Sequence, residues 1–318
     1  MPDNRARAIQ KERSAGLGTT YHRRVDSWPI EMSKSRESKD AERNNYVLVV
    51  FDSCRYDSFM RARPRAMRKL GPVERKWSYA SWTAPSHFNL LMGLMPHSSP
   101  KHIFASEYYK TEFLKYNQRL GCEDLKFQSL VPQLYLPPFL KNTLGYATHA
   151  RVSLPVLNPK TPINLGFDSF RLMDKHNDMR AIVREMRFTE ERPSFWVLNV
   201  GETHYPYALP GEPEEDWPRI HGVHGVFKHL QDPVVGGKLK GTRFFNRKTM
   251  DDLRHRQIAA VKYLDVVVEE LFDLVPKNTY ITITSDHGEM FGEDGYFGHG
   301  PVQHPKVLEV PFVEGKLR

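Results

Sequence analysis

Three short apolar runs constrain the fold more than any other feature of this sequence. They cover residues 46–51 (YVLVVF), 195–200 (FWVLNV) and 280–284 (YITIT). Each run is an almost continuous series of apolar or β-branched residues, which is typical of strands buried on both faces of a parallel sheet. The sequence therefore predicts that these runs are central strands of one mostly parallel sheet.

Helix-like stretches lie between the runs. The stretch from Met250 to Val275 predicts a long helix, because apolar residues recur in it at steps of three and four. Thr249 and Asp252 are spaced like a capping box at its start. Strands that alternate with helices indicate an α/β fold with a mostly parallel central sheet and helices on both faces.

Composition indicates a globular protein in a reducing compartment. The 318 residues are 40% hydrophobic, which is enough to bury a sizeable core. The two cysteines, Cys54 and Cys122, form neither a disulfide framework nor a CxxC motif. The first residues do not resemble a signal peptide, and no apolar stretch of about 18 residues follows. We therefore expect a cytoplasmic protein with no membrane span.

The net charge of +8 suits an anionic partner. Nucleic acid, an anionic surface and a small anionic substrate all fit this charge. The basic residues are dispersed rather than gathered in a run, which favours a mildly cationic surface over a dedicated nucleic-acid face. The sequence does not indicate an oligomeric state.

The chain divides into an arm and one large domain. Residues 1–44 are polar and lack a periodic apolar pattern, so they are expected to form an N-terminal arm ahead of a single domain at 45–318. Two intervals within that domain differ in composition: 97–144 is rich in Tyr, Phe and Lys, and 205–248 in Pro, Gly, His and aromatic residues. We expect both to be irregular insertions that form lids or substrate walls.

Polar side chains follow each of the three predicted strands. Asp52 comes directly after the first run, Thr203 and His204 follow the second, and Asp286 and His287 follow the third. One Asp after a strand is unremarkable, because Asp is common in turns. Ligands bind outside the carboxyl ends of strands in open α/β sheets, so three such positions together indicate a binding crevice.

A fourth element places a hydroxyl at the start of a helix. In the segment at 81–91 (SWTAPSHFNLL), Thr83 is a suitable N-cap and Pro85 suits a first helical turn. Free N–H groups and the helix dipole at such a position favour an oxyanion, so phosphate or sulfate can lie against Thr83. The alternative is a threonine that only caps its helix.

Four segments together resemble a known family. They are VVFDSCRYD at 49–57, TAPS at 83–86, ETHYPY at 202–207, and SDHGEMFGEDG at 285–295 with GHG at 298–300 and VPF at 310–312. In this order they resemble the motifs of the alkaline phosphatase superfamily, in particular its sulfatase-like branch, which includes phosphoethanolamine and lipoteichoic acid transferases. The resemblance covers residues 46–313.

The resemblance implies a metal-assisted nucleophile. Asp52, Asp286 and His287 would hold a divalent cation that also contacts Thr83. Mixed carboxylate and imidazole ligation suits Zn²⁺ or Mn²⁺ and permits Mg²⁺ or Ca²⁺. Coordination would stabilise the Thr83 alkoxide, which would attack phosphorus and form a phosphothreonine that water then releases.

Two histidines match further family positions. His204 and His299 correspond to residues that, in the transferases, bind a second metal or contact the substrate. They would hold a second ion about 4 Å from the first, or act as a general acid. The expected cofactor is therefore one or two divalent ions.

Other residues near the motifs are weaker candidates for a role in the site. Arg55 is a candidate clamp for the anion, His87 for substrate contact, and His304 for an extra ligand; each has a purely structural alternative. Cys54 lies close to Asp52, but no histidine base is near it in the sequence, so a buried core residue is expected.

The nucleophile position departs from the sulfatases. Sulfatases need Cys or Ser there, because oxidation to formylglycine supplies the attacking group, and an arginine normally follows four residues later; here the two positions hold Thr83 and His87. Threonine cannot yield that aldehyde, which favours phosphate esters. The expected function is a phosphomonoesterase or phosphodiesterase acting on a small anionic ester. The alternatives are phosphotransfer to an alcohol, sulfate-ester hydrolysis, or an inactive scaffold that binds anions or nucleic acid.

Overall fold

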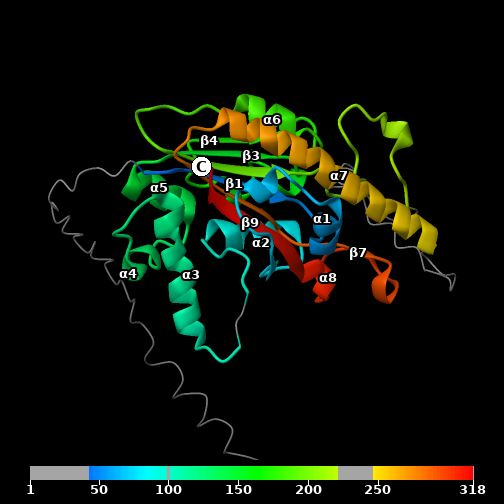
Figure 1. Ribbon diagram of the computed structural model, residues 1–318, viewed down its shortest axis with the longest axis horizontal. Helices are drawn as coiled ribbons and strands as arrows, with labels where there is room; N and C mark the ends of the chain where they lie inside the picture. Colours follow the sequence, from blue (N-terminus) through cyan, green and yellow to red (C-terminus); the bar gives the residue numbers. More distant parts are fainter. Residues whose placement is uncertain (1–42, 99–100, 221–245, 318) are drawn as a thin grey trace, which may run out of the picture. The chain divides into compact units, whose positions relative to one another are not determined.

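A seven-stranded sheet organises the described part of the chain. The computed structural model describes residues 43–98, 101–220 and 246–317 (Figure 1). The sheet has the strand order β2-β9-β6-β1-β5-β3-β4. Its strands are β1 (Asn45–Phe51), β2 (Glu74–Trp77), β3 (Ala147–Val152), β4 (Ser169–Leu172), β5 (Ser194–Val200), β6 (Thr279–Ser285) and β9 (Glu309–Lys316). A separate hairpin pairs β7 (Met290–Phe291) with β8 (Phe297–Gly298).

The three predicted strands are confirmed as neighbours at the centre of the sheet. β1 pairs in parallel with β5 on one side and with β6 on the other. Phe51 at the end of β1 stands level with Val200 of β5 and Ser285 of β6. The loops that follow these strands therefore leave the sheet at the same height. Only β9 runs antiparallel to its neighbours, β6 and β2, so the expected mostly parallel α/β class is also confirmed.

Helices cover both faces of this sheet (Figure 1). The α-helices are α1 (Tyr56–Ala62), α2 (Thr83–Leu91), α3 (Ala105–Leu120), α4 (Phe127–Leu130), α5 (Leu136–Leu144), α6 (Met179–Glu185), α7 (Arg247–Leu274) and α8 (Pro305–Leu308). Short 3-10 turns occupy Met67–Lys69, Pro155–Leu157, Pro162–Asn164, Glu214–Asp216 and Glu293–Gly295.

Alternate residues of β1 enter two different cores. Val47 and Val49 pack with α1, α6 and α7 on one face, whereas Leu48 and Val50 pack with α2, α3 and α5 on the other. All four side chains are fully buried. This two-sided burial is why the strand reads as a continuous apolar run rather than an alternating one.

Two local expectations were wrong. The interval 97–144 is mostly helical rather than irregular, because Phe113, Tyr116 and Leu120 recur on one face of α3 and pack on the sheet. The long helix starts at Arg247, and its N-cap is Asn246, whose side chain accepts a hydrogen bond from Lys248 N; the predicted capping box is therefore not formed.

Parts of the predicted organisation lie outside the described residues. These are the N-terminal arm up to residue 42 and residues 221–245 of the interval at 205–248. Among the helices that are described, none is long and apolar enough to cross a bilayer.

Candidate active site

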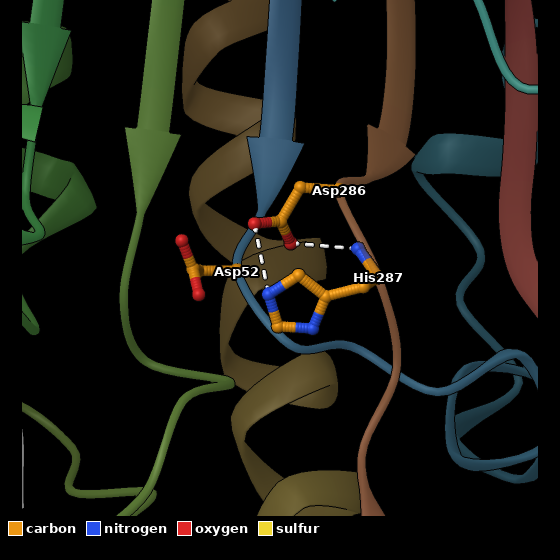
Figure 2. Close-up of side chains that lie close together, drawn as sticks. All are labelled: Asp52, Asp286 and His287. Atoms are coloured by element: carbon orange, nitrogen blue, oxygen red, sulfur yellow. Dashed lines mark hydrogen bonds and ion pairs between the residues drawn. The ribbon is translucent and has the colours of Figure 1, made fainter. Parts of the chain in front are cut away.

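Three predicted ligands meet at the carboxyl ends of the central strands. Asp52 follows β1, and Asp286 and His287 follow β6 (Figure 2). One ligand atom from each lies within 4.8 Å of the other two. The side chains point toward one another in Figure 2 and are at most 1% exposed. The level ends of β1 and β6 produce this convergence, as expected for the crevice of an open α/β sheet.

The backbone around His287 orients its imidazole. Nδ1 donates a hydrogen bond to the carbonyl of Gly288 at 2.8 Å, which turns Nε2 toward the carboxylates. Gly288 is needed there because a Cβ on it would lie 2.2 Å from the carbonyl oxygen of Lys306. His287 Nε2 stands 3.2 Å from Asp286 Oδ2, with which it forms an ion pair when the ring is protonated.

The donor set fits a divalent cation. Asp286 Oδ2 is buried and has no hydrogen-bond partner among the described residues. A neutral His287 with its proton on Nδ1 would direct a lone pair at that oxygen, so a proton or a cation has to lie between them. Two carboxylates and one imidazole, buried together, are ligands that divalent transition metals accept.

Burial of these charged groups next to one another shifts their pKa values. Burial raises the pKa of Asp52, and the nearby Asp286 carboxylate raises it further. Burial opposes ionisation of Asp286 as well, but His287 outweighs it and lowers the pKa of that carboxyl. For His287, burial lowers the pKa, but the Asp286 carboxylate dominates and raises it to about 9.

These shifts predict a pH-dependent stability for the metal-free protein. The pKa of His287 rises from 6.5 to about 9 on folding, so its pairing stabilises the fold fully below pH 6.5 and is lost as the pH rises through about 9. The free energy of unfolding should fall by on the order of 3 kcal/mol over this range. Denaturant titrations of chelator-treated protein would measure it. Metal-loaded protein should not show this loss, and an equal loss in both forms would contradict a shared metal and proton site.

Thr83 brings a hydroxyl to the cluster. Its Oγ1 lies 3.3 Å from His287 Nε2 and 3.4 Å from Asp52 Oδ1, and the residue is 4% exposed. Thr83 is the first residue of α2; the N-cap is Trp82, and its side chain makes no capping bond. The hydroxyl was thus correctly placed at a helix N-terminus, but it faces the ligand cluster rather than capping the helix.

His204 and His299 lie beside the cluster rather than within it. The ring of His299 is 4.3 Å from that of His287, and the ring of His204 is 5.2 Å from that of His299, measured between centroids. His299 Nδ1 lies 3.3 Å from Glu289 Oε1, and Tyr207 donates its hydroxyl to Glu289 Oε2. Burial lowers the pKa of His299, and His287 lowers it further. His299 Nδ1 also lies 3.4 Å from the Ser53 hydroxyl, which donates to Asp52.

The weaker candidates are engaged elsewhere. Arg55 is 1% exposed and pairs with Asp57 at 2.7 Å and Glu293 at 2.6 Å, so its guanidinium is not directed at the cluster. His304 is the N-cap of α8 and accepts a hydrogen bond from Lys306 N at 3.0 Å. Both side chains are thus paired within the protein, and the predicted contact of each with substrate or metal stays a prediction.

Cys54 and His87 are both buried. Cys54 is fully buried in the core, as expected. His87 is 2% exposed, and each of its ring nitrogens has a protein partner. The structure therefore leaves no ring nitrogen of His87 facing a bound substrate.

Three supporting residues were not predicted. Ser53 donates from its N–H to Asp286 Oδ1 at 3.0 Å and from its hydroxyl to Asp52 Oδ1 at 3.2 Å. Asn199 donates to Asp52 Oδ2 at 2.8 Å. Gln257 of α7 donates to the carbonyls of Ser53 and Thr203 at 2.9 and 3.0 Å. The sequence signal that could have identified two of them is a polar residue in an apolar element: Asn199 interrupts an apolar strand, and Gln257 lies on the apolar face of a helix.

The fold and the site together define a class of protein. A buried Asp-Asp-His cluster at the carboxyl edge of a mostly parallel sheet, with a hydroxyl at the start of a helix, is the arrangement of the alkaline phosphatase superfamily. Residues 44–313 match the family model named Sulfatase, and the chain belongs to this sulfatase-like family. No curated protein sequence matches the chain.

Solved structures share the fold at low sequence identity. The C-terminal periplasmic domain of EptC from Escherichia coli, solved in complex with zinc, is 17% identical with a TM-score of 0.50; the alignment covers 86% of this chain and 73% of that one. A putative sulfatase from Bacteroides thetaiotaomicron is 14% identical with a TM-score of 0.51 and coverages of 86% and 65%. The 2-O GAG sulfatase BT1596 is 14% identical with a TM-score of 0.50 and coverages of 86% and 64%.

The family sets the general chemistry. Its members are enzymes that hydrolyse or transfer phosphate or sulfate esters with the help of a divalent metal. The Asp52, Asp286 and His287 cluster fits that requirement.

Proposed function

We propose that this protein is a metal-dependent hydrolase of phosphate monoesters or diesters that works through a phosphothreonine at Thr83. One observation carries the proposal: the Thr83 hydroxyl lies 3.3 Å from His287 Nε2 and 3.4 Å from Asp52 Oδ1, directly at the ligand cluster. Thr83 also lies at the start of α2, a helix of nine residues. Among the described residues, no other hydroxyl both contacts two of the three ligands and lies at such a helix start.

Asp52, Asp286 and His287 would hold the cation, with Zn²⁺ or Mn²⁺ as the best fit to two carboxylates and one imidazole. Zinc bound in the EptC domain from Escherichia coli supports this choice by analogy of fold. The bound cation would supply charge that lowers the pKa of the Thr83 hydroxyl and neutralises the phosphate oxygens.

The other steps of the proposed reaction are carried out by residues of the protein itself. Thr83 Oγ1 attacks phosphorus, the bond to the ester oxygen breaks, and a phosphothreonine forms. The first-turn N–H groups of α2 lie where they can donate to the phosphate oxygens. His204 and His299 adjoin the cluster and are proposed to hold a second ion or to protonate the leaving alcohol. Water then hydrolyses the phosphothreonine.

Threonine at position 83 favours phosphate over sulfate. Oxidation of a cysteine or serine side chain gives the aldehyde that sulfatases use, whereas oxidation of the secondary alcohol of threonine would give a ketone. Thr83 therefore acts as an alcohol nucleophile, and phosphoryl groups form stable enough esters with an alcohol to serve as an intermediate.

A substrate panel tests this proposal. We expect the protein to hydrolyse nitrophenyl phosphate or bis-nitrophenyl phosphate, to lose activity with a chelator, and to regain it with Zn²⁺ or Mn²⁺. Nitrophenyl sulfate should be turned over far more slowly. Activity that survives exhaustive chelation, or a clear preference for the sulfate ester, would contradict the proposal.

The same panel separates the alternatives. If phosphothreonine accumulates in water and an added alcohol releases it, the protein is a phosphotransferase rather than a hydrolase. If metal analysis finds no ion bound at saturating zinc and no ester is cleaved, the protein is a scaffold, and a salt-sensitive shift with polyanions would then identify its ligand.

A further inference from the structure

Asn199 is a polar side chain inside the otherwise apolar strand β5, beside the candidate active site. It is fully buried and occupies the last position but one of the strand. Its Oδ1 accepts hydrogen bonds from the backbone N–H groups of Ser153 and Leu154 at 3.1 and 3.2 Å. Because a backbone N–H can only donate, these two bonds identify the amide oxygen, and the Nδ2 amino group faces the other way.

The Nδ2 amino group of Asn199 links Asp52 to His87. It donates to Asp52 Oδ2 at 2.8 Å and lies 3.2 Å from His87 Nε2. An amide nitrogen cannot accept a hydrogen bond, so His87 Nε2 is the acceptor and the proton of the neutral ring is on Nδ1. His87 Nδ1 lies 2.9 Å from the carbonyl oxygen of Thr83, which can only accept. Both contacts therefore require the same tautomer.

These contacts form a closed hydrogen-bonded ring that includes the proposed nucleophile Thr83. The ring runs from Asp52 Oδ2 through Asn199 and His87 to the backbone of Thr83, and the Thr83 hydroxyl returns to Asp52 Oδ1 at 3.4 Å. All four residues are at most 4% exposed. His87 Nδ1 also faces Asp286 Oδ2, but at 3.6 Å this contact is too long for a hydrogen bond.

We propose that Asn199 and His87 are positioning residues for the Thr83 nucleophile. Asn199 fixes the direction of the Asp52 carboxylate and the tautomer of His87, and His87 holds the first turn of α2 so that Thr83 Oγ1 stays at the ligand cluster. The inference rests on the proposed function of Thr83. Neither residue touches the reacting atoms, so their loss should disturb orientation rather than remove a chemical group.

Asn199→Asp removes the amino group and keeps the acceptor for Ser153 and Leu154. An ionised aspartate donates to neither Asp52 nor His87. If it takes up a proton beside the Asp52 carboxylate, it can donate to only one of them, so at least one of the two links is lost in either state. We expect kcat to fall by about 10- to 100-fold while KM stays within about twofold. The matched control is Asn45→Asp, because Asn45 is a 4% exposed asparagine at the start of β1, bonded to Asn278 and Ser194 at the opposite end of the sheet. Equal kcat values for the two variants would overturn the proposal.

His87 provides a second, independent comparison. His87→Asn keeps an amide donor near the position of Nδ1, whereas His87→Leu keeps a similar volume without a donor. We expect the leucine variant to lose about 10- to 100-fold in kcat and the asparagine variant to recover most of that loss. Equal kcat values for both variants would show that His87 only fills space. Thermal melts of each variant confirm that folded protein is compared.

Nitrogen NMR of histidine-labelled protein gives a readout that does not depend on activity. In the wild type, Nδ1 of His87 should carry a proton and Nε2 should be a bare acceptor, as the contacts with Thr83 and Asn199 require. A wild-type ring with its proton on Nε2 would overturn the inference. If instead Thr83→Ala proves fully active while the NMR result holds, the proposed function fails and the hydrogen-bonded ring stands.

Discussion

Replacing Thr83 with alanine is expected to lower kcat for phosphate-ester hydrolysis by a factor on the order of 10⁴ or more, because the attacking oxygen is removed. KM should change little, since the ligands of the cation and the N–H groups of α2 remain. Thr83 is not the N-cap of α2, and its hydroxyl contacts Asp52 and His287, so α2 should still form. Steady-state hydrolysis of nitrophenyl phosphate at saturating Zn²⁺ or Mn²⁺ measures the effect.

Thr83→Ser is the matched control for this loss. Serine retains a hydroxyl at the same position, 3.3 Å from His287 Nε2 in the parent protein, but lacks the methyl group that restricts χ1. We expect it to keep activity within about 10- to 100-fold of the wild type. If alanine and serine variants are equally active, Thr83 is not the nucleophile.

Replacing Asp286 with asparagine should abolish metal binding at the zinc concentrations that saturate the wild-type protein. The amide has the shape of the carboxylate but no charge, and Asp286 Oδ2 is one of the buried oxygens that have no hydrogen-bond partner in the described residues. Changes outside the ligand shell already cost about 10- to 100-fold in affinity, so losing a ligand should cost at least about 100-fold, with activity falling in parallel. Zinc competition with a chromogenic chelator measures the affinity.

Asp57→Asn is the control for the change from carboxylate to amide. Asp57 pairs with Arg55, Arg254 and Lys306 at 2.7–3.0 Å, away from the ligand cluster. Burial opposes its charge, but Arg55 outweighs burial and lowers its pKa, so this variant should lose stability while it keeps zinc affinity. Loss of zinc affinity in Asp57→Asn comparable with that in Asp286→Asn would contradict the assignment of the ligands.

The central strands and the ligands were predictable because both leave a local signature. Strands buried on two faces appear as continuous apolar runs, and the rule that crevices lie at the carboxyl ends of parallel strands then selects Asp52, Asp286 and His287. The outer strands lack such a signature. β2 is short and charged, with Lys76 buried over the ring of Phe312, and this packing depends on β9 from the far end of the chain.

The supporting residues were not predictable because their roles depend on side-chain direction. Arg55 and Asn199 are both polar and both close to the cluster, yet Arg55 turns to Asp57 and Glu293, whereas Asn199 turns to Asp52. Asp57 lies only two residues from Arg55, but the contacts of Arg55 with Glu293 and of Asn199 with Asp52 each join segments more than a hundred residues apart. The helices in 97–144 were missed for a similar reason, since the aromatic residues that drive α3 onto the sheet also suit an irregular insertion.

Mass spectrometry of Thr83 after rapid acid quenching tests the central claim most directly. Zinc-loaded protein mixed with a phosphate ester for less than one turnover and then digested should yield a peptide that contains Thr83 and carries one phosphoryl group on that residue. The modification should be absent without metal and absent in Thr83→Ala. A protein that turns over the ester with full metal dependence but never carries phosphate on Thr83 would contradict the account.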